Sequence, residues 1–272
     1  MSVGVGILGF AHGHVHAYCS RWRDQPEHGV RIVAGWDRDS GCAQNACKAL
    51  AIECVPSVGA LLSRRDISAV VIASETALHA ELVEQAAAAG KAVVLQKPMA
   101  LTLDQADRIV GAAERPGVPF TMAWQMRMAP HNLQLIELQQ RRGTLPGADH
   151  FPPPSLWEGS GGGIRGPSPF PLPAGEGMRL SCISFPRVNN IPWPPSGIQL
   201  KWYLHQAGEW TISDLPEIRD HGERIAGLAG PLAEFLRRER PAIATAQDGR
   251  NALRLVLACY ASAEQGRRIY LW

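Results

Sequence analysis

The stretch VGVGILGFAHGH, residues 3–14, decides the fold of the first half of the chain. A short apolar run, Val3–Leu8, passes directly into a turn that contains two glycines. A buried strand followed at once by such a turn is typical of a dinucleotide-binding crossover. Compared with Gly-x-Gly-x-x-Gly, the turn has Ala11 at the second glycine and His14 at the third. The motif alone is imperfect, so the sequence around it has to support it.

Apolar runs alternate with helical periodicity over the first 123 residues. Five strands are expected, at Val3–Leu8, Val30–Trp36, Ala69–Ala73, Ala92–Leu95 and Phe120–Ala123. Between them, Glu81–Ala89 has the spacing of a helix that Gly90 ends, and Thr102-x-x-Gln105 is typical of a helix start. This alternation predicts an α/β fold, a Rossmann-type doubly wound parallel sheet.

The composition of the chain argues against several classes of protein. The 272 residues include 27 Lys or Arg and 25 Asp or Glu, a net charge of +2, and no basic run that would favour nucleic acid. No apolar stretch reaches the 18 residues of a membrane span. The amino terminus enters a strand without a charged leader. Together with six cysteines that form no Cys-x-x-Cys pair, these features favour a reducing, cytoplasmic location.

Three histidines of the first turn, His12, His14 and His16, invite a metal reading. Alternate residues share a face only in a strand, whereas this segment is expected to be a turn and a helix start. We therefore expect no metal site. Contact between this turn and the cofactor, with His14 or His16 lining the crevice, is the favoured interpretation.

Asp37 closes the second strand, where a carboxylate can accept hydrogen bonds from the ribose hydroxyls of NAD. The neighbouring Arg38 could instead accommodate the 2′-phosphate of NADP. The sequence thus predicts NAD or NADP as cofactor and slightly favours NAD. A plain helix-capping role for Asp37 is the alternative.

The run GKAVVLQKP, residues 90–98, delivers Lys97 and Pro98 to the end of a short apolar strand. Ligands of open α/β sheets bind outside the carboxyl ends of the strands. A desolvated lysine placed there can transfer a proton near neutral pH. Lys97 is therefore the candidate catalytic residue; the alternative is an ordinary surface lysine.

These residues together resemble the glucose–fructose oxidoreductase/inositol dehydrogenase/rhizopine-catabolism (Gfo/Idh/MocA) family. The stretches that carry the resemblance are Val5–Gly9, Asp37, Ser74–His79, Gly90–Pro98, Ala123–Arg127 with Pro130, and, near the C-terminus, Leu200–Tyr203, Gly222–Ile225, Pro231–Leu236 and Asp248–Ala261. The resemblance implies an NAD(P)-dependent oxidoreductase that transfers hydride to or from a carbinol carbon of a sugar or cyclitol. It implies Lys97 as the catalytic residue. The cofactor-binding residues that it and the first turn indicate are Gly9, Phe10, Ala11, His12, Gly13, Asp37, Arg38, Ser74, Glu75, His79, Gln96, Lys97, Pro98 and Arg127.

The chain departs from the family pattern in two places. Gln96 stands where the family usually has Glu, which removes a carboxylate that could hold Lys97 charged. The family's Asp-x-x-x-His, whose histidine contacts the substrate hydroxyl, has no counterpart in the expected region. The substitutes are Asp24 with His28 in the wrong domain, Glu217 with His221, and His205. None of them is singled out by the sequence.

The second half reads as a truncated α+β domain. We expect a Rossmann domain over 1–124 and a substrate and oligomerisation domain over 125–272, with an irregular Pro/Gly-rich insert over 144–196. From 146 to 177, 16 of 32 residues are Pro or Gly, which predicts an irregular, protease-sensitive tract. Four further strands are expected at Arg179–Phe185, Ile198–Leu204, Glu209–Ser213 and Arg267–Trp272.

Two further features bear on packing and assembly. Leu253, Val256, Leu257 and Tyr260 recur at helical spacing and should face a core. Four tryptophans of the second domain could share an apolar face, or a contact in a homo-oligomer: Trp193, Trp202, Trp210 and Trp272. The leading function is an oxidoreductase that acts on a small polyol or sugar. The alternatives are a non-catalytic dinucleotide-binding protein, a degenerate family member, and an oligomeric scaffold.

Overall fold

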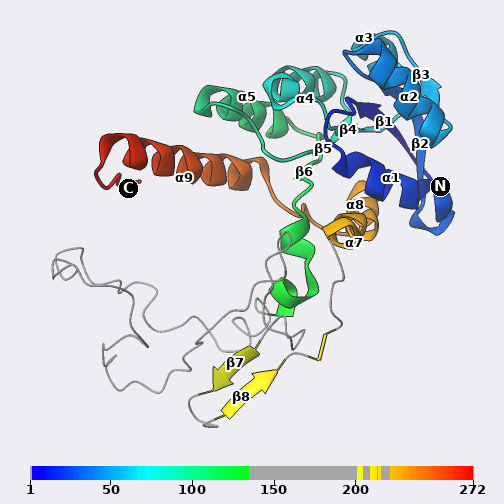
Figure 1. The fold of residues 1–272 in the computed structure, drawn as a ribbon. Helices are drawn as coiled ribbons and strands as arrows, with labels where there is room; N and C mark the ends of the chain where they lie inside the picture. Colours follow the sequence, from blue (N-terminus) through cyan, green and yellow to red (C-terminus); the bar gives the residue numbers. More distant parts are fainter. Residues whose placement is uncertain (1, 135–200, 205–208, 213, 216–220, 272) are drawn as a thin grey trace. The chain divides into compact units, whose positions relative to one another are not determined.

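The computed structural model describes residues 2–134, 201–204, 209–212, 214–215 and 221–271. The chain divides into two compact units, one formed by Met1–Ala129 with Arg219–Trp272 and the other by Pro130–Ile218. The first unit carries the parallel sheet (Figure 1).

The sheet of the first unit has six parallel strands in the order β3-β2-β1-β4-β5-β6. Their bounds are β1 Val3–Leu8, β2 Val30–Trp36, β3 Glu53–Cys54, β4 Ala69–Ile72, β5 Ala92–Leu95 and β6 Phe120–Met122. The chain runs outward from β1 through β2 to β3 and then returns to β4 on the other side of β1. The strand order therefore reverses between β1 and β4, and ligands of doubly wound sheets bind at such a point.

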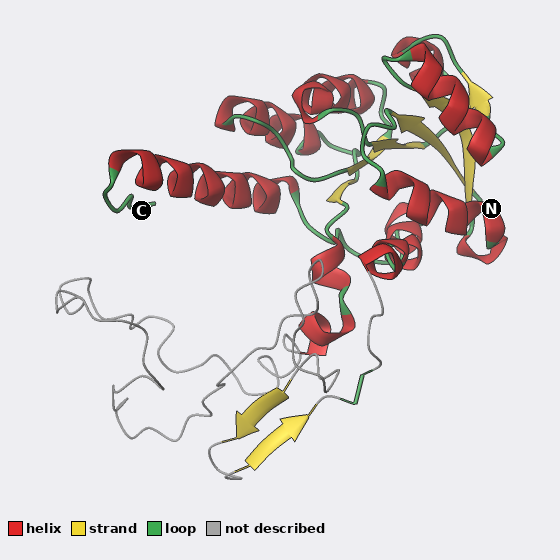
Figure 2. Ribbon diagram, viewed as in Figure 1, coloured by secondary structure: helices red, strands yellow, loops and turns green. Residues whose placement is uncertain are grey.

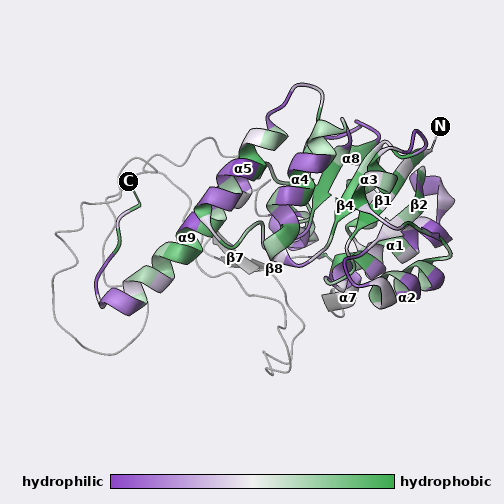
Figure 3. Cartoon of the chain, turned by 90° about the horizontal axis from the view of Figure 1, so that it is seen from above, coloured by the Kyte–Doolittle hydropathy of each residue, from purple (hydrophilic) through white to green (hydrophobic). Residues whose placement is uncertain are grey.

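Helices cover both faces of the sheet (Figure 2). One face packs against α1 (His14–Asp24), α2 (Ser40–Leu50) and α8 (Ala229–Leu236), around fully buried Tyr18 and Trp22. The other packs against α3 (Val58–Leu62), α4 (His79–Ala88) and α5 (Leu103–Ala113). Coloured by hydropathy, the strands form an apolar layer between these helices (Figure 3). Strands covered on both faces are necessarily almost continuously apolar.

Further helices and 3-10 turns complete the first unit. The 3-10 turns are η1 Pro26–His28, η2 Thr76–Leu78 and η3 Gln125–Met128, and the remaining α-helices are α7 His221–Ala226 and α9 Ala246–Gln265. Thr102 caps α5, since its hydroxyl accepts the Gln105 N–H at 3.2 Å. Five predicted strands and the predicted helix start are confirmed, with ends that move by at most one residue. The two-residue β3 was not predicted.

The domain boundary expected at residue 124 differs from the structure. Helices α7 and α8 pack on the parallel sheet: Ile225, Leu232 and Phe235 are buried in the same core as β1. The Trp22 indole N–H also donates to the Ala229 carbonyl at 2.8 Å. The C-terminal helices therefore complete the first unit: the apolar side chains of α7 and α8 cover the α1 side of the sheet, and the start of α9 packs against the core of the α5 side.

The second unit contains an antiparallel hairpin of β7 (Lys201–Leu204) and β8 (Glu209–Ile212), which confirms two predicted strands in shortened form. The insert expected at 144–196, with its tract 146–177, and the strand expected at Arg179–Phe185 lie outside the described residues, as do Trp193 and Trp272. The side chains of Trp202 and Trp210 are likewise not described.

Two predictions for the C-terminus are wrong. Arg267–Trp272 was expected as a strand, but residues 267–271 follow the end of α9 at Gly266 without a regular element. The helical stripe beginning at Leu253 was expected to face a core, yet Val256 and Tyr260 are 49% and 66% exposed. Only the start of α9 is buried, at Ala246 and Gly249, and Leu253 packs partly against the core of the α5 side.

Candidate functional site

The candidate site lies at the carboxyl edge of the sheet, at the reversal between β1 and β4. The turn after β1 is held against β4, since the His12 N–H donates to the Ala73 carbonyl at 3.0 Å. Gly9 adopts φ +90°, and a Cβ there would lie 2.3 Å from the Ser74 Cα. No side chain fits at that position, so glycine allows the turn and the β4 end to meet.

The amino terminus of α1 opens at this turn. Its N-cap is Gly13, which makes no side-chain capping bond, and a Cβ at Gly13 would meet nothing within 4 Å. The start of α1 therefore has no side-chain cap from position 13 and has space beside that glycine. The amide groups at the positive end of a helix dipole suit a diphosphate.

Asp37 lies just after β2 and is 6% exposed. One carboxylate oxygen accepts the Phe10 N–H at 2.6 Å and the other accepts the Asp39 N–H at 2.9 Å. The side chain thus fixes the turn after β1, residues 9–13, which we call the nucleotide turn. Its remaining lone pairs can still accept hydroxyl donors. The capping alternative fails, because Asp39 caps α2 by accepting the Cys42 N–H at 2.8 Å.

Lys97 lies two residues beyond β5 and is half-buried. Burial lowers the pKa of its amine below the ordinary lysine value. Among the residues that the structure describes, no carboxylate forms an ion pair with this amine. Desolvation without a counter-charge favours the neutral amine, the form that accepts a proton.

His79 supports the lysine loop from within the protein and is fully buried. Its Nδ1 lies 3.1 Å from the Met99 carbonyl and its Nε2 lies 3.2 Å from the Ser74 carbonyl. Burial lowers the pKa of its imidazole. The ring therefore ties the end of β4 to the loop that carries Lys97. A side chain with no exposed surface acts at the site only through the segments that it joins.

Gln96 is also fully buried, and its Nε2 donates to the Tyr18 hydroxyl at 2.9 Å. Its Oε1 has no hydrogen-bond partner among the described residues. Burial raises the pKa of Tyr18 well above its usual range. Sequence reasoning missed Tyr18, since one aromatic residue on an amphipathic helix carries no signal of its partner.

The other predicted site residues lie around this edge. Ala11, Arg38, Glu75 and Pro98 are exposed, whereas Phe10 and Ser74 are buried. Arg127 lies beyond β6, where its guanidinium bonds the Asp248 carboxylate at 3.0 Å and lies over the Trp124 ring at 5.1 Å. The structure thus binds Arg127 to the start of α9.

Of the substitutes for the missing Asp-x-x-x-His, the Asp24 and His28 pair does not reach this edge, and the side chain of His221 is not described. Asp24 pairs with Arg23 at 2.7 Å, and His28 contacts Gln25 at 3.0 Å, both near the amino end of β2. Glu217 and His205 lie outside the described residues. Within the described ranges, no group of three or more His, Cys, Asp or Glu side chains is arranged for a metal ion, and no helix is long and apolar enough to cross a membrane.

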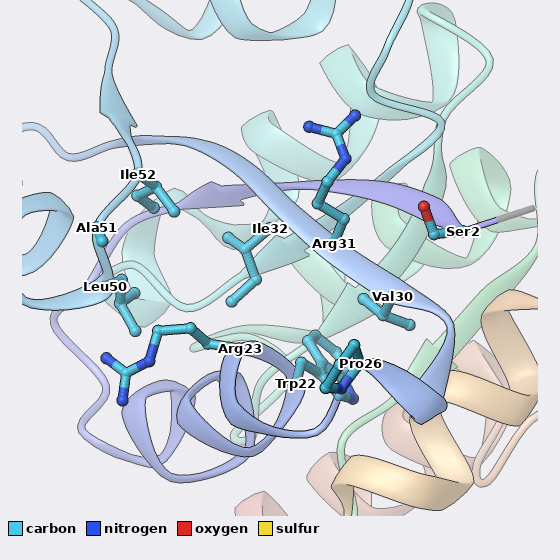
Figure 4. A pocket seen from close by; sticks show the side chains of 10 residues that line it. All are labelled: Ser2, Trp22, Arg23, Pro26, Val30, Arg31, Ile32, Leu50, Ala51 and Ile52. Atoms are coloured by element: carbon cyan, nitrogen blue, oxygen red, sulfur yellow. The ribbon is translucent and has the colours of Figure 1, made fainter.

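A separate pocket of about 320 Å³ opens beside the amino ends of β1 and β2 (Figure 4). Its lining residues are Ser2, Trp22, Arg23, Pro26, Val30, Arg31, Ile32, Leu50, Ala51 and Ile52. The Arg23 guanidinium already bonds Asp24 and the Ala49 carbonyl. With an apolar lining and this guanidinium engaged, the pocket lacks the chemistry of the carboxyl edge.

Comparison with known proteins identifies the first half of the chain. Residues 3–124 match the family Gfo/Idh/MocA, described as an oxidoreductase family with an NAD-binding Rossmann fold. D-apiose dehydrogenase of Paraburkholderia graminis is 40% identical over 144 residues, 53% of this chain and 36% of that protein. Inositol 2-dehydrogenase of Rhizobium meliloti is 30% identical over 48% of this chain and 38% of its own length.

A 2,7-anhydro-N-acetylneuraminate hydratase of Mediterraneibacter gnavus is 34% identical over 44% of this chain and 30% of that protein. A solved 3-ketoreductase from Actinomadura kijaniata, in complex with NADP and TDP-benzene, has 25% identity and a TM-score of 0.46 over 52% of this chain and 43% of its own. The matched part of the chain thus spans 30% to 38% of the length of these three curated relatives. Residues 3–124 thus match the NAD-binding Rossmann domain of the Gfo/Idh/MocA oxidoreductase family.

Proposed function

We propose that the chain transfers hydride between a carbinol carbon of a sugar or polyol and a nicotinamide dinucleotide. One observation carries the proposal: a desolvated lysine without a carboxylate partner lies at the carboxyl edge of the sheet, beside the nucleotide turn. Perturbed ionisable groups at such an edge are candidate catalytic groups. The named dehydrogenases among the relatives act on the same substrate class.

In this proposal the protein binds and orients the dinucleotide and the substrate, and the dinucleotide supplies the hydride chemistry. The uncapped start of α1 holds the diphosphate, and Asp37 receives the ribose hydroxyls. The neutral form of Lys97, which burial favours, accepts the proton of the substrate hydroxyl and returns it in the reverse direction. Gln96 and His79 act indirectly, by fixing the segments on either side of Lys97.

The test begins with dinucleotide binding measured by calorimetry. We expect NAD(H) to bind more tightly than NADP(H), and Asp37→Ala to weaken NAD binding by roughly 1–3 kcal/mol. Asp39→Ala is the matched control, since it removes a helix cap two residues away and should leave NAD affinity unchanged. A clear preference for NADP would refute the role assigned to Asp37.

Turnover is then followed as NADH formed from NAD over a panel of polyols and sugars. Net NADH formation separates a dehydrogenase from a hydratase, the activity named for one relative. The competing function is a non-catalytic dinucleotide-binding protein. The absence of a substrate histidine within the described site favours it, and tight NAD binding without turnover on any substrate would establish it. Self-association through the second unit remains part of our proposal and is tested by sedimentation.

A further inference from the structure

His12 belongs to the nucleotide turn, but its main chain lies against the strand that neighbours Lys97. The His12 N–H donates to the Ala73 carbonyl at 3.0 Å, directly after β4. On the adjacent strand, the Gln96 N–H donates to the Ile72 carbonyl at 3.0 Å. The His12 main chain therefore lies beside the end of β4, and Lys97 follows the neighbouring strand β5 at the same edge of the sheet.

The His12 imidazole lies within electrostatic reach of Lys97. Its Nδ1 is buried and has no hydrogen-bond partner among the described residues. Burial, the positive charge of Lys97 and the charge of His79 all lower its pKa, while contact with the Lys97 main chain acts in the opposite direction. The His14 ring meets it edge-on, with the centroids 4.4 Å apart. The partly exposed ring thus lies against His14 and within electrostatic reach of Lys97 and His79.

We propose that His12 is a positioning residue for Lys97. Its ring, resting on the Lys97 main chain, holds the lysine at the edge of the sheet and keeps water from its amine. This replaces what a carboxylate neighbour would do: His12 keeps Lys97 in place without holding it charged. The kinetic consequence rests on the proposed function, whereas the contact itself does not.

The contact is tested in the full chain without nucleotide, by NMR titration of ¹³C-labelled histidine. Lys97→Met removes the positive charge, so the pKa of His12 should rise, whereas Lys97→Arg should leave it low. Lys91→Met, at the other end of β5, is the matched control and should leave the His12 pKa unchanged. An unchanged His12 pKa in Lys97→Met overturns the proposal.

Competitive acetylation of the Lys97 amine, read by mass spectrometry against pH, tests the positioning directly. In His12→Ala, water gains access to the amine and stabilises its charged form. Because only the neutral amine is acetylated, labelling at pH 7 should fall about threefold or more. His12→Gln, which can still reach the Lys97 main chain, should restore labelling, and His28→Ala should have no effect. Wild-type labelling in a folded His12→Ala would contradict the role.

If turnover is found, His12→Ala should lower kcat with little change in KM, and His12→Gln should recover part of it. A chain that binds no dinucleotide, or shows no turnover, would refute the proposed function. The two titrations would still decide whether His12 positions Lys97.

Discussion

Strand β5 carries a lysine at each end, and the two lysines are used differently. Lys91, before the strand, donates to the Arg64 carbonyl at 2.9 Å and to the Ile67 carbonyl at 2.7 Å. Lys97, after the strand, is desolvated, its pKa is lowered, and no carboxylate pairs with it in the described part of the chain. Both are half-buried. Burial is therefore not what separates them; the partners are.

The difference shows how one sheet separates stability from chemistry. A cation that satisfies two carbonyls stabilises the fold and is unavailable for proton transfer. A cation that is buried without a partner costs stability, and its neutral form becomes accessible near neutral pH. The amino edge of β5 follows the first pattern and the carboxyl edge the second.

The largest expected effect separates the two lysines in catalysis. Positioned acid–base groups contribute typically ~10²–10⁴-fold to rate, so Lys97→Met should lower kcat by about that factor while NAD affinity stays nearly unchanged. Lys91→Met should keep wild-type kcat. Steady-state rates with any substrate found for the chain provide the measurement. Equal kcat in the two variants would mean that the carboxyl-edge lysine is not catalytic.

The second effect concerns the free energy of unfolding, to which we expect Lys91 and not Lys97 to contribute. Lys91→Met leaves the Arg64 and Ile67 carbonyls without their donor and should lower the free energy of unfolding by about 1–3 kcal/mol. Urea denaturation followed by circular dichroism measures it. Lys48→Met, on the surface of α2, is the control and should change stability by less than about 0.5 kcal/mol. A loss no larger than in the control would show that the two hydrogen bonds contribute little.

The sequence predicted the parallel sheet and its edge well, because strands that are covered on both faces have a clear, almost continuous apolar pattern. It also placed Lys97 correctly after β5. It did not predict that the side chain of Gln96 would be buried against Tyr18, since this contact joins residues 78 positions apart. The prediction that the helical stripe around Val256 faces a core was wrong for a related reason. Periodicity indicates a helix, but it does not show how much of that helix packs against other elements.

Gln96→Glu sharpens the comparison at the carboxyl edge. The new carboxylate would be fully buried beside Tyr18, so its pKa should rise above the usual glutamate value. A raised pKa in the folded state costs nothing below about pH 4 and becomes a penalty as pH rises; a shift of one unit costs about 1.4 kcal/mol at pH 7. Denaturation at pH 4.5 and pH 7 measures this cost, with exposed Gln247→Glu as control. Equal stability losses at both pH values would mean that the loss does not come from burying the charged carboxylate.

The smallest effect tests whether Lys97 costs stability as it stands. Its pKa is lowered in the folded chain, so between that value and the unfolded value of about 10.5 the unfolded chain binds more protons. Stability of the wild type therefore rises with pH across this window, and the penalty of the charged amine is present in full below the folded-state pKa. Lys97→Met removes the penalty and should match or exceed the wild-type Tm at pH 7, by a few degrees at most for a half-buried group.

This advantage should shrink as pH rises towards 10, because the folded amine then loses its proton and with it the cost of burying a charge. Thermal melts of Lys97→Met and wild type at pH 7 and pH 9.5 measure the difference, and Lys91→Met in parallel should melt lower at both. A Lys97→Met chain less stable than wild type at pH 7 would mean that Lys97 has a stabilising partner, and that the two ends of β5 are alike.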